Sequence, residues 1–111
     1  MNWITLDQEA QLALLITESF QKDQVIFKHS TLCGISRIAL QRLERSDVPE
    51  NAVFFLLDLL RNRSLSSLVS ERFGVPHESP QLLLIRNGEC IYAESHLDIS
   101  MPELTRQLTL V

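Results

Sequence analysis

Cys33 is the residue of this chain whose type and position most clearly indicate chemical reactivity, because it lies where a strand pattern gives way to a helical pattern. A thiol at the start of a helix faces backbone N–H groups without partners and the positive end of the helix dipole. Both favour the thiolate, which is the nucleophilic form of cysteine. The sequence therefore indicates a reactive thiol at Cys33, with a small buried cysteine as the alternative.

The residue three positions after Cys33 is Ser36, where a dithiol oxidoreductase would have its second cysteine. A hydroxyl cannot form a disulfide, so the site is interpreted as monothiol. Ser36 could donate its hydroxyl to the thiolate, or it could bond back to a carbonyl of the preceding turn. The second cysteine of the chain, Cys90, lies in an apolar strand pattern, and we interpret it as a packing residue far from the helix start.

Three histidines, His29, His77 and His96, raise the question of a metal site with Cys33. The spacing of 43 residues between Cys33 and His77, and of 18 between His77 and His96, matches no compact ligand pattern. The sequence therefore predicts neither a metal site nor a cofactor. Instead, His29 or His77 is expected near the thiol, where a protonated imidazole would favour the thiolate and a neutral one could shuttle its proton.

The composition favours one globular domain over residues 1–111, with 45% hydrophobic and 22% charged residues. A net charge of −4, without a basic cluster interleaved with aromatic residues, argues against binding to nucleic acid. No apolar run reaches the roughly 18–20 residues that cross a bilayer, and the N-terminus does not resemble a signal peptide. We therefore expect a cytoplasmic protein with no membrane or nucleic-acid partner.

Hydrophobic periodicity predicts the element order β-α-β-α-β-α-β-β-α. The expected strands are residues 1–6, 24–29, 52–58, 81–86 and 89–94, the last two joined by the turn Asn87-Gly88. The expected helices follow Asp7 as N-cap, follow the Cys33 loop, cover about 64–73 up to Gly74, and follow the cap Ser100. In the helix after Cys33, the positions predicted to face the core are Ile35, Ile38, Ala39 and Leu43.

Three segments, taken together, resemble the monothiol bacilliredoxin family, the thioredoxin-fold proteins of the bacillithiol system. They are Ser-Thr-x-Cys-x-Ile-Ser at residues 30–36, His-Glu-Ser-Pro-Gln at 77–81 and Ser-His-x-x-Ile at 95–99. The resemblance extends from about residue 25 to the C-terminus. One position departs from the family pattern, because the family usually has proline directly after the cysteine and this chain has Gly34. Glycine keeps the backbone N–H that proline lacks and leaves the turn looser.

The resemblance implies a thioredoxin-like α/β fold, with a mixed central sheet of four to five strands flanked by helices on both faces. It also implies a cis peptide bond between Ser79 and Pro80, in a loop that faces the cysteine. The backbone of Ser79 would then pair with a bound peptide-like thiol as a strand does. Thr31 is a further candidate substrate contact, although it or Ser30 could simply cap the helix. Ser36, Gly34, His29 and His77 are the candidate residues around the thiol.

The function implied is thiol–disulfide exchange. The Cys33 thiolate would attack a mixed disulfide between a client protein and a low-molecular-weight thiol similar to bacillithiol. The client would leave reduced, and the small thiol would stay on Cys33 until a second thiol molecule or a reductase removes it. Two alternatives stay open: a non-catalytic adaptor with the same fold, and a pair of subunits that share an iron–sulfur cluster through Cys33, as monothiol glutaredoxins can.

Overall fold

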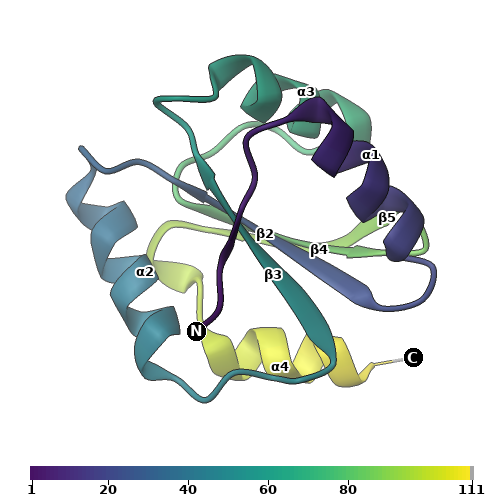
Figure 1. Ribbon diagram of the computed structural model, residues 1–111. Coiled ribbons are helices and arrows are strands. Elements are labelled where there is room, and N and C mark those ends of the chain that lie inside the picture. The colour runs from purple at the N-terminus through teal and green to yellow at the C-terminus, as the bar shows by residue number, and fades with distance from the viewer. Residues whose placement is uncertain (111) are drawn as a thin grey trace.

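Five strands form one mixed sheet at the centre of the computed structural model, which describes residues 1–110 (Figure 1). The elements, in chain order, are β1 (Ile4–Thr5), α1 (Glu9–Glu18), β2 (Asp23–His29), α2 (Gly34–Arg45), β3 (Ala52–Asp58), α3 (Arg63–Phe73), β4 (Gln81–Arg86), β5 (Glu89–Ser95), the short 3₁₀ helix η1 (His96–Asp98) and α4 (Met101–Thr109). The predicted order of strands and helices is confirmed, with η1 as an addition. None of these helices is long and apolar enough to span a membrane.

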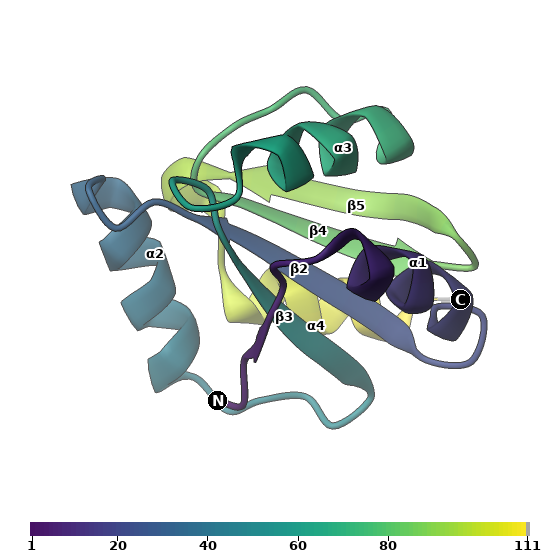
Figure 2. The same cartoon turned by 45° about the horizontal axis from the view of Figure 1, so that its top comes forward.

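The sheet has the strand order β1-β3-β2-β4-β5, so β2 lies at its centre. Both β1 and β2 run parallel to β3, whereas β4 runs antiparallel to β2 and to β5. Lys28, near the end of β2, pairs with Gln81, the first residue of β4. The loop after β2, which carries Cys33, and the loop before β4, which carries Pro80, therefore emerge at the same end of the sheet (Figure 2).

Each face of the sheet is covered by two helices, α1 and α3 on one side and α2 and α4 on the other (Figures 1 and 2). Every residue of 24–29 in β2 is buried, as expected of a strand that is covered on both faces. The core on the α2 and α4 side consists of Val25, Phe27, Ala39, Leu43, Ala52, Phe54, Leu82, Leu84, Ile99, Met101, Leu104 and Leu108. The core on the α1 and α3 side consists of Leu6, Leu12, Leu15, Ile26, Phe55, Leu57, Leu65, Val69, Leu83 and Ile85.

The inward face of α2 differs from the prediction. Ile35 and Ile38 are 42% and 44% exposed, and the buried residues of this helix are Ser36, Ala39 and Leu43. These three positions follow the spacing of three and four that a helix requires, but the stripe starts at a serine. The prediction was therefore wrong for the first turn of the helix, where the inward-facing residue is the polar Ser36 and not an isoleucine.

Two predicted N-caps are wrong. The N-cap of α1 is Gln8 rather than Asp7, and the Gln11 side chain accepts hydrogen bonds from the backbone N–H of both residues, at 2.9 Å and 3.0 Å. The N-cap of α2 is Cys33 itself, so neither Ser30 nor Thr31 caps that helix. Strand β1 also covers only two residues instead of six, because only Ile4–Thr5 pairs with β3.

The C-terminal half of the chain follows the prediction closely. Gly74 ends α3 with a φ of 64°, and the turn between β4 and β5 has φ of 53° at Asn87 and 78° at Gly88. Glycine and asparagine adopt this left-handed region most readily, which explains their positions here. The Ser100 hydroxyl accepts a hydrogen bond from the N–H of Glu103 and caps α4.

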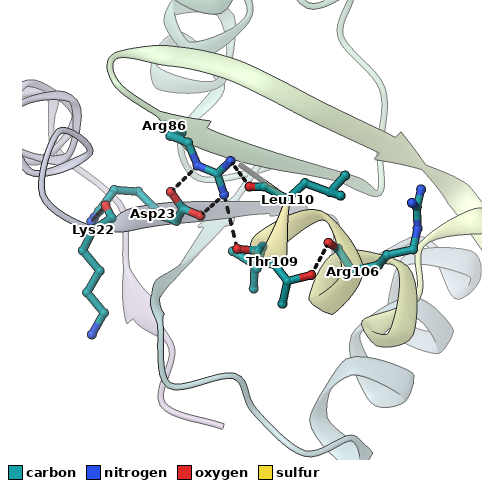
Figure 3. Close-up of polar contacts among 8 residues, drawn as sticks. Lys22, Asp23, Arg86, Arg106, Thr109 and Leu110 are labelled. Atoms are coloured by element: carbon teal, nitrogen blue, oxygen red, sulfur yellow. Dashed lines mark hydrogen bonds and ion pairs between the residues drawn. The ribbon is translucent and has the colours of Figure 1, made fainter.

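Arg86 connects three elements at the other end of the sheet (Figure 3). Its Nε and Nη2 donate to the two carboxylate oxygens of Asp23, at 2.8 Å and 2.6 Å, and its Nη1 donates to the carbonyl of Leu110, at 2.7 Å. The hydrogen bonds to Asp23 raise the pKa of the Arg86 guanidinium above its ordinary value. This contact fixes the start of β2 against the end of β4 and against the segment after α4.

We expect Arg86→Met to lower the free energy of unfolding by about 2 kcal/mol, because it leaves the carboxylate of Asp23, whose side chain is only 12% exposed, without its partner. Urea denaturation followed by circular dichroism measures the loss. The control is Arg106→Met, which breaks an exposed pair with Glu103 and should leave the stability nearly unchanged. Equal losses in both variants would contradict a structural role for the Arg86 contact.

Candidate active site

Cys33 lies at the first turn of α2, immediately after the loop that follows β2. Its N–H donates to the carbonyl of Ser30, at 3.2 Å, and its carbonyl accepts from the N–H of Arg37, at 3.1 Å. The thiol is partly exposed, is not in a disulfide and makes no capping hydrogen bond. As N-cap, Cys33 precedes the first N–H groups of the helix, which have no partners within it. The side chain is thus placed at the positive end of α2, as the sequence predicted.

Gly34 is the first helical residue of α2. A Cβ added at this position would have only one neighbour within 4 Å outside the local backbone, the Nη2 of Arg37 at 4.0 Å. Packing therefore does not require glycine here, and the position has room for a side chain. The guanidinium of Arg37 is the nearest charged group to that position.

Ser36 is fully buried and joins α2 to the end of β2. Its Oγ lies 2.6 Å from the Nδ1 of His29 and accepts a hydrogen bond from the N–H of Ser30, at 3.0 Å. Neither of the two predicted partners of this hydroxyl, the thiolate or a carbonyl of the preceding turn, is among its hydrogen bonds. Burial lowers the pKa of His29, while Asp58 and Glu44 act in the opposite direction.

His29 is therefore linked to the first turn of α2 through Ser36, three residues after Cys33, and its proximity to the thiol stays a prediction. Its ring stacks on Phe27, with the ring centroids 6.0 Å apart, beneath the start of α2. No hydrogen bond joins Cys33 to His29 or to His77 in the part of the chain that the structure describes. Among the candidate residues around the thiol, His29 and Ser36 form one buried pair, and the hydrogen-bond partners of His77 belong to β2 and α3.

Lys28 is the residue that the sequence analysis missed. It lies on the face of β2 opposite His29, is fully buried, and its Nζ donates to the carbonyl of Ser66, at 3.2 Å, and to the Oγ of Ser70, at 2.8 Å. The Nδ1 of His77 lies 3.4 Å from the same Nζ. Burial lowers the pKa of Lys28 to about 8. The sequence could have indicated this site, because Lys28 directly follows the apolar residues 25–27 of a strand that is expected to be buried, where its charge would not be hydrated.

His77 contacts Lys28 and α3 instead of Cys33. Its Nδ1 lies 3.5 Å from the Oγ of Ser66, and the rest of the residue is exposed. Burial of the ring on this side and the charge of Lys28 both lower the pKa of His77, and Glu78 opposes them. The imidazole is therefore neutral at pH 7.

The peptide bond between Ser79 and Pro80 is cis, as the resemblance implied. Pro80 is buried, and its carbonyl accepts a hydrogen bond from the N–H of His96, at 3.0 Å. The Oγ of Ser79 is buried and has no hydrogen-bond partner within residues 1–110. Thr31 lies exposed in the loop before Cys33. The topology brings the segments 30–36 and 77–80 to one end of the sheet, although no hydrogen bond joins them directly.

Cys90 is placed as predicted for a packing residue. It lies half-buried in β5 against the core on the α1 and α3 side, and its Sγ donates to the carbonyl of Tyr92 at 3.4 Å. Burial raises the pKa of this thiol. Cys33 begins α2, which packs on the other face of the sheet. Within residues 1–110, no three histidine, cysteine, aspartate or glutamate side chains gather as metal ligands.

Comparisons with known proteins agree with this geometry. Residues 4–104 match the family model described as monothiol bacilliredoxin BrxC. A solved structure described as a candidate oxidoreductase with a thioredoxin fold is 29% identical, with a TM-score of 0.82 over 93% of this chain and 90% of that one. Thioredoxins of Malassezia sympodialis and Fasciola hepatica are 18% and 20% identical, with TM-scores of 0.75 and 0.73. They cover 97% and 95% of this chain and 89% and 95% of their own. The predicted thioredoxin-like fold is thus confirmed.

We expect Ser36→Ala to lower the free energy of unfolding by about 2 kcal/mol, because the buried N–H of Ser30 and Nδ1 of His29 lose their shared partner. Urea denaturation measures the change, and Ser67→Ala, which removes an exposed hydroxyl from α3, is the matched control. An unchanged midpoint in Ser36→Ala would mean that the hydroxyl is not structural.

Lys28 makes stability depend on pH in a defined window. Its pKa is about 8 in the folded protein and 10.5 ordinarily, so the unfolded chain keeps a proton that the folded chain releases between these values. Stability therefore rises with pH across this window, by up to roughly 3 kcal/mol relative to Lys28→Met. Free energies of unfolding of both proteins at pH 7.5 and pH 10.5 measure the difference. A constant difference would show that Lys28 keeps its ordinary pKa.

Proposed function

This chain belongs to the monothiol bacilliredoxin family, and we propose that it is a thiol–disulfide oxidoreductase that removes a low-molecular-weight thiol from client proteins through Cys33. The family and the thioredoxin fold support a thiol redox function. The observation that carries the proposal is the position of Cys33, partly exposed and unbridged at the start of α2. This position leaves the sulfur accessible to a disulfide at the end of the helix where backbone N–H groups have no partners within the helix.

The reaction begins when the Cys33 thiolate attacks the sulfur of the small thiol in a mixed disulfide with a client cysteine. The disulfide bond breaks, and the client sulfur leaves as a thiolate and takes up a proton. A new disulfide then joins Cys33 to the small thiol. A second molecule of that thiol, as thiolate, attacks this disulfide and releases Cys33, so that two small thiols are oxidised to their disulfide and one client is reduced.

The surroundings of Cys33 support a monothiol cycle. Ser36 occupies the position of a second cysteine, but its oxygen is buried and hydrogen bonded to His29 and Ser30. Cys90 lies in β5, against the opposite face of the sheet from α2. Neither residue is placed to resolve a disulfide on Cys33, so release requires a thiol or a reductase from outside the chain.

The loop before β4 and the loop before α2 form the two sides of the proposed substrate site. Ser79 and Pro80 position the incoming disulfide on one side, where the backbone of Ser79 pairs with the client peptide. Thr31 and Gly34 border the thiol on the other side. The N–H of Gly34 remains available to the substrate, because the position carries no proline. The partners in this proposal are client proteins with S-thiolated cysteines and a bacillithiol-like thiol, in the cytoplasm.

Trapping of the small thiol tests this proposal. A client peptide in mixed disulfide with the thiol is mixed with the protein, and intact mass after acid quenching shows what is bound. We expect Cys90→Ser to gain the mass of the small thiol as the wild type does, and Cys33→Ser to gain none and to release no reduced peptide.

The rate of alkylation of Cys33→Ser, Cys90→Ser and wild type separates this function from an adaptor with the same fold. We expect the wild type and Cys90→Ser to react at pH 6 much faster than a free peptide thiol, because a stabilised thiolate is the reacting form. A Cys33 that reacts no faster than the peptide, together with no trapped adduct, would favour the adaptor.

A further inference from the structure

The polar cluster under the loop before β4 has no role in the exchange described above. Its centre is the Nζ of Lys28, which has three neighbours with acceptor atoms: the carbonyl of Ser66, the Oγ of Ser70 and the Nδ1 of His77. Within the described residues, no carboxylate forms a hydrogen bond or ion pair with this amine. A buried lysine without a counter-ion is costly, so its three hydrogen bonds are its compensation.

These contacts determine where the ring proton of His77 lies. A lysine ammonium has three donor hydrogens and no acceptor, so an atom that bonds to it must be an acceptor. The Nδ1 of His77 therefore carries no proton, and the single ring proton of the neutral imidazole is on Nε2. The Oγ of Ser66, 3.5 Å from the same Nδ1, is compatible with this assignment because a hydroxyl can also donate.

His77 lies in the loop before β4, which the proposed function makes one side of the substrate site. His77 is two residues before Ser79, and Lys28 pairs with Gln81 at the start of β4. The Nδ1 side of the ring faces Lys28 and α3, whereas the residue as a whole is exposed. The Nε2–H points away from Lys28, because the two ring nitrogens lie on different sides of the imidazole. It has no hydrogen-bond partner within residues 1–110.

We propose that Lys28 is a positioning residue, which fixes the proton of His77 on Nε2 so that His77 donates a hydrogen bond to an oxygen acceptor of the bound mixed disulfide. This inference rests on the proposed function, and it adds a substrate contact and the residue that orients it. The acceptor is a carboxylate of the small thiol or a carbonyl of the client peptide, since both present the same oxygen chemistry to an N–H donor.

The groups that surround His77 set how this arrangement responds to pH. Lys28 of β2 is the cation next to Nδ1, and Glu78 is the adjacent anion in the same loop. Glu78 is itself 3.3 Å from the Nε2 of His96. The contributions from α3, Ser66 and Ser70, are uncharged. Protonation of Nδ1 would place two cations 3.4 Å apart, which disfavours the protonated ring and lowers the pKa of His77, while Glu78 opposes this effect.

The ring proton can be located without any activity. Two-bond ¹H–¹⁵N spectra of the wild type at pH 7.5 should show His77 as the Nε2–H tautomer. In Lys28→Met the pKa of His77 should rise, and the ring should become a mixture of both tautomers. The Nδ1–H tautomer in the wild type, or an unchanged His77 in the variant, would overturn the assignment. This result is independent of whether the protein exchanges disulfides.

Kinetics test whether the Nε2–H contacts the substrate. We expect Lys28→Met and His77→Phe each to raise the KM for a mixed-disulfide peptide about five-fold, the loss of one hydrogen bond, with kcat unchanged. The double variant should be no worse than either single variant, because both remove the same contact. The control is Lys22→Met, at an exposed lysine, which should behave as the wild type.

Two substrates distinguish the sources of the acceptor. If the effect appears with a 3-mercaptopropionate mixed disulfide and vanishes with a 2-mercaptoethanol one, the acceptor is the carboxylate of the small thiol. If it appears with both, the acceptor is a carbonyl of the client peptide. An unchanged KM for both substrates in a folded His77→Phe variant would overturn the contact. If Lys28→Met does not fold, two other measurements test the positioning role of Lys28. They are the tautomer of His77 in the wild type, and the tautomer of His77 and the KM in Ser70→Ala, which removes one hydrogen-bond partner of Lys28.

Discussion

The pairing of β2 with a strand on each side is the constraint on which the rest of the structure depends. β2 pairs with β3 along its whole length and with β4 along five residues, so its backbone is satisfied on both edges and its residues are buried on both faces. The chain leaves this strand directly into the loop with Cys33. The position of the thiol is therefore set by a strand that is paired on both edges.

The alternation of side chains along β2 places one buried polar contact on each face of the sheet next to the site. His29 faces α2 and bonds Ser36, while its neighbour Lys28 faces α3 and contacts His77. Each of these two contacts connects the end of β2 to one of the two segments that border the proposed site. The segment with Cys33 is fixed through His29, and the loop before β4 is fixed through Lys28. One strand end thus orders both sides of the proposed substrate site.

Much of the fold could be predicted from the sequence, because it depends on local patterns. The apolar runs of β2, β3 and β4, the turn Asn87-Gly88 and the end of α3 at Gly74 each have a local physical cause. The inward face of α2 could not be predicted in full, because the rotation of a helix depends on what it packs against. A buried Ser36 looks like a surface residue until His29 and Ser30 are known to meet it.

The same limit applies to the candidate site. Cys33, the monothiol spacing and the cis bond before Pro80 followed from residue types and the family resemblance. The partners of Lys28 come from α3 and from the loop at His77, which are 38 to 49 residues away along the chain. Hydrophobic periodicity relates only residues that are close in sequence. The sequence therefore showed a lysine in an apolar run but not which groups accept its hydrogen bonds.

The buried position of Ser36 also bears on how this site could change during evolution. Replacement of serine by cysteine alters one atom and would restore the spacing of a dithiol enzyme. A thiol accepts and donates hydrogen bonds only weakly, however, and the larger sulfur would enter a space already closed by the ring of His29 and the backbone of Ser30. A protein with cysteine at position 36 would therefore be less stable unless His29 were replaced as well. The packing around Ser36, and not only the absence of a second cysteine, thus favours a monothiol site.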